Sequence, residues 1–214
     1  MRRGIDGLEN LGRPPVKKPL PTVPISFEEF LDWCDEDTRA EWVNGRVVLM
    51  SPVSMEHQLL LTFLIQVVGM FVDHHELGKV FFAPFLMRLS AVPSAREPDL
   101  IFVAKEREAL FQRLFLDGPA DLAVEIVSRW SVRRDGRDKF REYEVAGVRE
   151  YWLIDPARKS ADFYTLESNG KYSAVDIGED GLFRSRVVDG LFLRPEWLWN
   201  APAAMDVLRE LKVI

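Results

Sequence analysis

The sequence predicts an α/β fold in which strands buried on both faces are combined with helices and an antiparallel C-terminal hairpin. Residues 97–103 and 121–128 are apolar runs of the β type, and each carries an acid among leucine, isoleucine and valine. Such runs are typical of fully buried strands. The apolar residues of 60–72 are too dense for a surface helix, so we expect this helix to pack against the sheet. A Ser-Asn-Gly-Lys turn at 168–171 joins two further β-type runs.

The domain organisation follows from length and composition. The chain has 214 residues, enough for one good-sized core. Residues 1–24 hold several prolines and glycines and few periodic apolar residues, so we expect a flexible or extended tail before a single domain over 25–214. Ser26 and Glu29 form a capping-box pattern, which predicts the start of the first helix of this domain.

Two further local patterns place candidate site residues on early elements. Asn44-Gly45 between two β-type runs indicates a hairpin with a type I′ turn, and Glu41 lies on its first strand. Ser54 is the expected N-cap of the following apolar helix. His57 would lie in the first turn of that helix, where an imidazole can offer a hydrogen bond to a phosphate or a water. The alternative for His57 is a structural or surface residue.

The rest of the chain continues with strands and helices. Residues 79–89 read as one long or bent strand with Pro84 at an edge or bulge, and residues 90–97 read as a loop. Gly147 is the expected left-handed stop of a helix over 132–146. The other expected elements are a short surface helix over 105–112, strands over 150–156 and 182–188, and a closing helix near 202–211.

Composition limits the classes of protein to which the chain can belong. It is 47% hydrophobic and 29% charged, as ordinary globular proteins are. The formal net charge of -6 argues against a protein that coats nucleic acid by bulk attraction. The single cysteine, Cys34, excludes an internal disulfide, is typical of a reducing cytoplasm and reads as a small hydrophobe rather than a nucleophile. We find no apolar run approaching the roughly 20 residues that cross a bilayer and no secretory signal, so we expect a cytoplasmic protein without a membrane partner.

A basic cluster directly follows the second buried strand. Six arginine and lysine residues against two aspartates give residues 129–141 a local charge of +4. The cluster is either a solvated helix face with i,i+4 ion pairs or a surface that holds a phosphate backbone. Its basic residues are Arg129, Arg133, Arg134, Arg137, Lys139 and Arg141.

Asp99, Glu125 and Lys139 form one candidate site. A carboxylate in a buried strand is costly unless a metal or a hydrogen-bonding partner takes it up. If the two strands pair, Asp99 approaches Glu125, and the two carboxylates make an oxygen site suited to Mg²⁺ or Mn²⁺. The helical period puts Lys139 on one line with Tyr143 and so toward the core, where it would orient or deprotonate a water or neutralise a transition state. The alternative is an exposed ion pair with Asp135.

Other chemistries lack their motifs in this chain. It contains no GxxxxGK[ST] or GxGxxG phosphate loop, no HExxH, no CxxC pair and no GxSxG elbow. A glycosidase-like acid pair from Asp99 and Glu125 is conceivable, but it gives no role to the adjacent arginines and lysine.

An ordered series of motifs extends over roughly residues 27–172. The motifs are Glu41-Trp42-Val43-Asn44-Gly45, Met50-Ser51-Pro52, Glu56-His57-Gln58, Glu97-Pro98-Asp99, Val124-Glu125-Ile126-Val127-Ser128, Asp135 with Lys139 and Tyr143, and the run 146–155. The series resembles the Uma-two family of restriction-endonuclease-like proteins, which belongs to the PD-(D/E)XK nuclease superfamily. This resemblance implies a restriction-endonuclease-like core, with a central mixed sheet flanked by helices, and metal-dependent hydrolysis of phosphodiester bonds.

The resemblance also implies roles for single residues. Asp99 matches the metal-binding aspartate of the superfamily, Glu125 matches its second acid, and Glu41 matches the N-terminal glutamate that supports the metal or its waters. The short Glu-x-Lys of the superfamily reads Glu125-Ile126-Val127 here, so that Lys139, one helix later, resembles the relocated lysine of this family. Arg129 stands where the family often has proline.

The implied function is that of a Mg²⁺- or Mn²⁺-dependent endonuclease acting on nucleic acid, with DNA as the expected substrate. The alternatives are a catalytically inactive binding or assembly module on the same fold, and metal chemistry on a small phosphate ester. Residues 197–199 and the terminal helix could cover either a homodimer interface or the protein's own core. The candidates for contact with nucleic acid are His57, Arg129, Arg133, Arg134 and Arg137.

Overall fold

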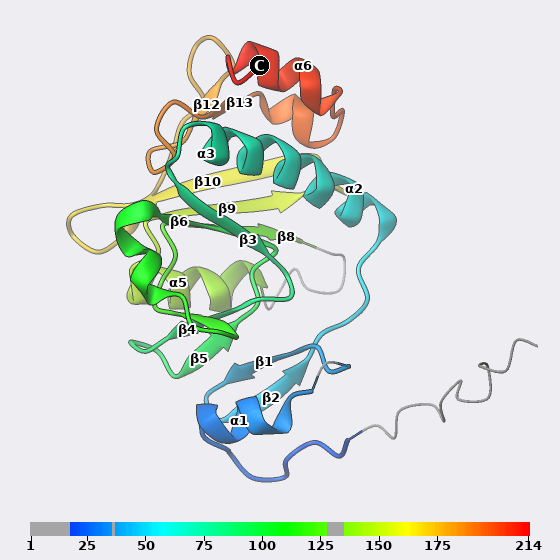
Figure 1. The fold of residues 1–214 in the computed structure, drawn as a ribbon, viewed down its shortest axis with the longest axis vertical. Helices are drawn as coiled ribbons and strands as arrows, with labels where there is room; N and C mark the ends of the chain where they lie inside the picture. The colour runs from blue at the N-terminus through cyan, green and yellow to red at the C-terminus, as the bar shows by residue number, and fades with distance from the viewer. Residues whose placement is uncertain (1–17, 36, 128–134) are drawn as a thin grey trace, which may run out of the picture.

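A six-stranded mixed sheet lies at the centre of the protein. The computed structural model describes residues 18–35, 37–127 and 135–214, and within them the strand order of this sheet is β11-β10-β9-β8-β6-β3 (Figure 1). β8 and β9 run parallel, whereas the other neighbouring pairs are antiparallel. The predicted mixed sheet is therefore confirmed. Its strands are β3 Gly78–Phe82, β6 Leu100–Ala104, β8 Leu122–Ile126, β9 Glu150–Asp155, β10 Ser160–Leu166 and β11 Tyr172–Ala174.

A five-stranded sheet has the strand order β2-β1-β5-β4-β7. Its neighbouring strands are antiparallel except for β4 and β7, which are parallel. Helix α1, Phe27–Trp33, packs on this sheet because its two buried phenylalanines share an apolar cluster with Ala40 and Ala95. The strands are β1 Ala40–Val43, β2 Arg46–Leu49, β4 Leu86–Leu89, β5 Ser94–Arg96 and β7 Phe115–Asp117.

Helices cover both faces of the six-stranded sheet (Figure 1). On one face α2, Met55–Leu64, continues through a π-helical stretch, Ile65–Gly69, into α3, Met70–His74. On the other face a π-helical turn, Asp135–Lys139, leads into α5, Phe140–Ala146. The start that the sequence predicts for this second helix, at Val132, lies outside the described residues. The expectation of a mixed sheet flanked by helices agrees with this arrangement.

Alternation along β8 divides the core between these two helical layers. Val124 belongs to the apolar cluster that contains the buried residues of α2 and α3. Its neighbour Ala123 belongs to a second cluster, which contains Tyr143 of α5. Because successive strand residues point to opposite faces, Glu125 shares the α5 side with Ala123.

The C-terminal segment completes the first of these clusters. Trp197 and Leu198, from the 3-10 turn Pro195–Leu198, are buried in it together with Val207 and Leu208 of α6. This segment therefore covers the protein's own core rather than leaving these side chains for a subunit interface. The remaining elements are α6 Ala204–Glu210, the antiparallel pair β12 Phe183–Arg184 and β13 Phe192–Leu193, and the 3-10 helix Lys105–Leu110.

Local sequence signals mark the starts, turns and ends of elements at the positions that the sequence predicts. Ser26 accepts a hydrogen bond from the Glu29 N–H while the Glu29 carboxylate accepts one from the Ser26 N–H, which completes the capping box. Asn44 and Gly45 take φ angles of 49° and 79°, as a type I′ turn requires. Gly147 ends α5 with a φ of 91°. The predicted C-terminal hairpin is formed by β10 and β11.

Three predicted elements differ from the structure. Residues 79–89 are not one strand, because the chain leaves the six-stranded sheet after β3 and enters the five-stranded sheet as β4. Pro84, which has no N–H for a sheet ladder, lies between them. The predicted loop 90–97 contains β5, whose three residues are all buried. The strand predicted over 182–188 is reduced to the two residues of β12.

One helical run corrects the expectation that no apolar stretch approaches the length of a membrane span. Residues Met55–His74 are long and apolar enough by length and composition, with a mean hydropathy of 1.5. Half of this run is buried inside the protein, and its buried residues pack against the six-stranded sheet. The same features are found in core helices, so the run is weak evidence for a membrane partner.

Candidate functional site

Asp99 and Glu125 lie at the same end of the paired strands β6 and β8. β6 and β8 are antiparallel, with Leu100 opposite Val124, and extending this register by one residue sets Asp99 opposite Glu125. The Ile126 N–H donates a hydrogen bond of 2.6 Å to Asp99 Oδ2. Asp99 therefore sits at the end of its strand with its carboxylate tied to the strand that carries Glu125.

The second oxygen of Asp99 points to helix α2. Asp99 Oδ1 lies 3.1 Å from Nε2 of His57, and the side chains are 14% and 6% exposed respectively. The Asp99 carbonyl accepts a hydrogen bond from the Ala83 N–H. Backbone and carboxylate are thus both fixed, from three different parts of the chain. Both Asp99 and His57 line a cavity of about 250 Å³, together with Arg39, Gln58 and Thr62.

Glu125 is held by two side chains from the helical segment on the other face of the sheet. Lys139 Nζ donates a hydrogen bond of 2.8 Å to Glu125 Oε2, and the Tyr143 hydroxyl donates one of 2.6 Å to Oε1. Lys139 and Tyr143 are four residues apart, so they share one side of the helix. Burial, followed by the charges of Glu125 and Glu41, raises the pKa of Tyr143 well above its usual range. Tyr143 therefore acts as a hydrogen-bond donor to Glu125.

Lys139 lies between two carboxylates. Its Nζ is 3.0 Å from Glu41 Oε1 as well as 2.8 Å from Glu125 Oε2, and Lys139 is 1% exposed. Burial alone would raise the pKa of Glu41, but the charges of Lys139 and Arg96 outweigh it and lower the pKa to about 2. Glu41 is therefore ionised at neutral pH. The structure brings together Glu41, Glu125 and Lys139, and places Asp99 on the neighbouring strand.

Arg96 extends this network in a way that the sequence did not suggest. Its Nη1 donates to Glu41 Oε2 at 2.8 Å, while Nε and Nη2 form a bidentate pair with Glu142 at 2.7 and 2.6 Å. Burial alone would lower the pKa of Arg96, but the carboxylates of Glu142 and Glu41 raise it above its usual range. Arg96 thus links β5 to β1 and to α5. An arginine in a short segment that reads as a loop gives no sequence signal for such burial.

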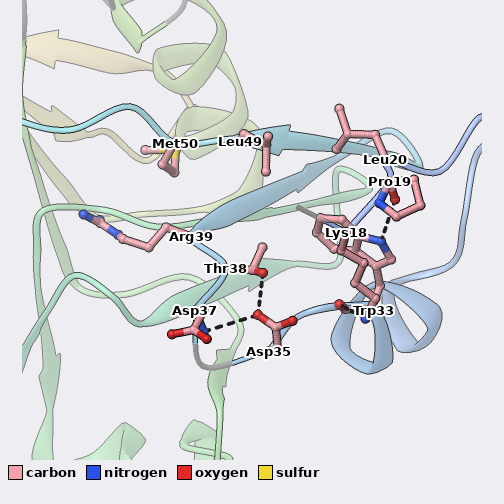
Figure 2. A pocket seen from close by; sticks show the side chains of 10 residues that line it. All are labelled: Lys18, Pro19, Leu20, Trp33, Asp35, Asp37, Thr38, Arg39, Leu49 and Met50. Carbon is pink, nitrogen blue, oxygen red and sulfur yellow. Dashed lines mark hydrogen bonds between the residues drawn. The ribbon is translucent and has the colours of Figure 1, made fainter. Parts of the chain in front are cut away.

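Glu97 and Arg39 form the outer part of the network. The Glu97 N–H donates a hydrogen bond of 3.1 Å to Glu41 Oε1, and the Glu97 carboxylate is paired with Arg39. Burial raises the pKa of Glu97 in spite of Arg39. Arg39 also lines a larger cavity of about 630 Å³, at the end away from Lys18 and Trp33 (Figure 2). Arg39 therefore borders both this cavity and the smaller one at Asp99.

The predicted basic surface is only partly described. Arg129, Arg133 and Arg134 lie outside the described residues. Arg137 is exposed on the π-helical turn that carries Lys139.

Cys34 is half-buried, and burial followed by the charge of Asp35 raises the pKa of its thiol to about 11, which disfavours a nucleophilic thiolate.

The residues present fit a divalent cation through a small donor set. Within the described ranges no group of three or more His, Cys, Asp or Glu side chains is arranged to hold a metal. Two carboxylates, Asp99 and Glu125, remain as the donor set, and Asp99 lines a cavity. Mg²⁺ is commonly bound through one or two carboxylates and completes its coordination with water and substrate phosphate. Asp99 and Glu125 match this chemistry in the type of their ligand atoms.

The fold and these carboxylates define a restriction-endonuclease-like α/β protein. A family model described as "Putative restriction endonuclease" (Uma2) matches residues 27–196, and the chain belongs to this family. The structure is similar to a crystal structure of "a putative nuclease belonging to DUF820 from Anabaena variabilis ATCC 29413", with a TM-score of 0.69. The two chains are 18% identical, and the match covers 83% of this chain and 98% of that one. At this identity the likeness concerns the fold. No curated protein matches the chain.

Proposed function

We propose that the chain is a Mg²⁺- or Mn²⁺-dependent endonuclease that hydrolyses phosphodiester bonds of nucleic acid, with DNA as its substrate. The observation that carries this proposal is the position of Lys139, which is buried and hydrogen-bonded to Glu125 beside the strand of Asp99. A binding module has no need to bury a lysine against two carboxylates, because buried ion pairs seldom add stability. The matching family description, restriction endonuclease, agrees with this function.

Asp99 and Glu125 would hold the cation. When bound, a divalent cation polarises a phosphoryl oxygen, lowers the pKa of a bound water and screens negative charge that develops at phosphorus. Asp99 is prepared for this role because both of its oxygens are held: Oδ2 accepts a hydrogen bond from the Ile126 N–H, and Oδ1 lies 3.1 Å from His57 Nε2. A carboxylate has about four lone-pair sites, so these two contacts leave capacity for a metal.

Lys139 would stabilise charge at the scissile phosphate. Glu41 and Glu125, both within 3.0 Å of Nζ, favour the charged ammonium form. A protonated lysine orients a water or neutralises a transition state rather than removing a proton. Glu41 thus acts through Lys139, which it holds in place together with the Arg96 network.

The nucleic acid would be held by basic residues around this centre. Arg137 is exposed on the turn before Lys139, and Arg39 lies beside Asp99 at the cavity of about 250 Å³. The basic run of the sequence from Arg129 to Arg134 precedes Arg137 in the chain. Phosphate contacts of this kind fix the position of a backbone without reading its sequence. We place the enzyme in the cytoplasm, in accordance with its single cysteine.

A cleavage assay tests the proposal. Supercoiled plasmid, linear duplex, single-stranded DNA and RNA are incubated with the protein in Mg²⁺, Mn²⁺ or EDTA. We expect metal-dependent cleavage of DNA that falls at least about a hundredfold in Asp99→Ala and Lys139→Ala. Lys171→Ala removes an exposed lysine that is paired with Glu144, and serves as the control.

Three results would contradict the proposal. A folded protein that binds no divalent cation and leaves all four substrates intact would show that the centre is not a nuclease site. Binding of nucleic acid without cleavage would indicate the inactive module instead. Cleavage of a small phosphodiester but of none of the polymers would show that the substrate is a small phosphate ester and not a nucleic acid.

A further inference from the structure

His57 is buried at the centre rather than displayed on the surface. Its side chain is 6% exposed and its Nε2 lies 3.1 Å from Asp99 Oδ1. Its Nδ1 is buried and has no hydrogen-bond partner among the described residues. A histidine placed to grip a phosphate would present an N–H to solvent, whereas here the nitrogen with a partner is directed at a carboxylate. The contact of His57 with nucleic acid that the sequence suggested stays a prediction, and the geometry in the structure is that of His57 with Asp99.

We propose that His57 is a positioning residue of the metal centre, which sets the orientation of Asp99 and thereby the affinity for the divalent cation. The inference rests on the proposed function, since it takes Asp99 as a metal ligand. It goes further by assigning to His57 an outer-shell role that acts before any nucleic acid binds.

The hydrogen-bond pattern indicates how His57 would act. Because Nδ1 has no partner among the described residues while Nε2 faces a carboxylate, the proton belongs on Nε2. The Nε2–H then donates to Asp99 Oδ1, while the Ile126 N–H donates to Oδ2. Two donors on different oxygens fix the rotation of the carboxylate plane. The remaining lone pairs of Asp99 are then held in one direction.

The fold places His57 with the precision that this role requires. Ser54 caps α2 and accepts a hydrogen bond from the His57 N–H at 3.2 Å, so His57 lies in a fixed first turn. Leu60, Leu61 and Leu64 of the same helix are buried in the core against the six-stranded sheet. The imidazole is therefore carried by a rigid element, and Asp99 by the end of a core strand. Outer-shell partners of this kind typically contribute 10- to 100-fold to metal affinity.

Mn²⁺ binding in the absence of nucleic acid tests the inference. The free Mn²⁺ signal in electron paramagnetic resonance gives the dissociation constant for the full chain and its variants. His57→Leu removes the donor, and we expect it to weaken Mn²⁺ binding at least about tenfold. His57→Gln places an amide N–H about as far out as Nε2, so it should bind within about threefold of wild type. His74→Leu, at an exposed histidine of α3, is the matched control and should bind as wild type does.

A second pair of variants keeps the test valid if His57→Leu does not fold. The amide of asparagine reaches only as far as Nδ1, so His57→Asn should bind Mn²⁺ as weakly as a variant without the donor, whereas His57→Gln should not. Equal affinities of His57→Asn, His57→Gln and wild type would overturn the inference. Asp99→Ala separates this failure from failure of the proposed function. If wild type itself binds no Mn²⁺, or if Asp99→Ala binds it with unchanged affinity, Asp99 is not a metal ligand. This result would refute both the positioning role of His57 and the proposed function.

Discussion

Lys139→Met is the substitution that tests the buried network most severely. Methionine has nearly the shape of lysine, so the change removes the ammonium and little volume. It leaves Glu41 and Glu125, which are 2% and 4% exposed, without the cation that lies within 3.0 Å of both. Removal of one partner from a buried ion pair typically costs about 3 to 5 kcal/mol. We expect a loss of stability in this range at neutral pH.

The pKa of Glu41 gives an independent magnitude and a pH dependence. The pKa is about 2 in the folded protein against an ordinary value of 4.5, which corresponds to about 3 kcal/mol of stability at neutral pH. A lowered carboxyl pKa stabilises the folded state above the unfolded pKa, and this contribution is lost as the pH falls from 4.5 toward 2. Lys139 supplies only part of this shift, because Arg96 Nη1 also lies 2.8 Å from Glu41 Oε2 and remains in Lys139→Met. The variant should therefore lose part of this contribution, and the pKa of Glu41 should rise. The stability gap to wild type should therefore be largest above pH 4.5 and should shrink as the pH falls toward 2.

The assay is urea unfolding followed by tryptophan fluorescence, for which the chain has six tryptophans. It is run at about pH 7 and about pH 3, on either side of the ordinary carboxyl pKa, with EDTA, so that no metal replaces the lost charge. Lys171→Met is the control, because its lysine is 67% exposed in its pair with Glu144 and should change stability by less than about 1 kcal/mol. A loss below about 1 kcal/mol for Lys139→Met, or a loss that does not change with pH, would refute the argument that Lys139 neutralises two buried carboxylates.

Three further substitutions, two of them with a comparison variant, examine the parts of this account separately. Glu41→Gln keeps the shape but removes a charge that holds Lys139. Cleavage should therefore fall at least about tenfold, while the affinity for Mn²⁺ stays at the wild-type value. A parallel loss of cleavage and Mn²⁺ binding would indicate that Glu41 is a metal ligand instead. Arg96→Lys keeps the charge but loses the bidentate pair, and urea unfolding should show a free energy of unfolding lower by about 2 kcal/mol. The control Arg194→Lys, at an exposed pair, should lower it by less than about 1 kcal/mol. Equal effects of the two variants would show that Arg96 does not link these elements. Gly147→Ala should lower the free energy of unfolding by about 1 kcal/mol because φ is positive there. Gly69→Ala, inside the helical run with open space around it, should raise it by about 0.5 kcal/mol or more. Similar shifts of the melting temperature in both variants would contradict the backbone argument.

The sequence predicts those features that depend on neighbouring residues. The capping box at Ser26, the Asn44-Gly45 turn and the stop at Gly147 each require only a few adjacent positions, and the structure has all three. The two acid-bearing strands are visible because a charge in an apolar run is costly without a partner. The helical period also placed Lys139 and Tyr143 on one line, and both contact Glu125.

The features that the sequence does not reveal depend on residues far apart in the chain. β3 and β4 read as one apolar run, yet they enter different sheets, and only the pairing partners of each strand decide this. Arg96 reads as a surface residue because arginine is rarely buried unless it is paired, and its partners Glu41 and Glu142 are 55 and 46 residues away. The contact of His57 with Asp99 likewise joins two elements that no spacing rule connects.

The central claim is that Asp99 and Glu125 hold one divalent cation beside Lys139. Crystals of the protein soaked with Mn²⁺, and measured where manganese scatters anomalously, test it most directly. The account predicts an anomalous peak at about 2.0 to 2.4 Å from carboxylate oxygens of both Asp99 and Glu125, which is absent from crystals of Asp99→Ala. A well-ordered centre without a peak, or a peak at other side chains only, would contradict it.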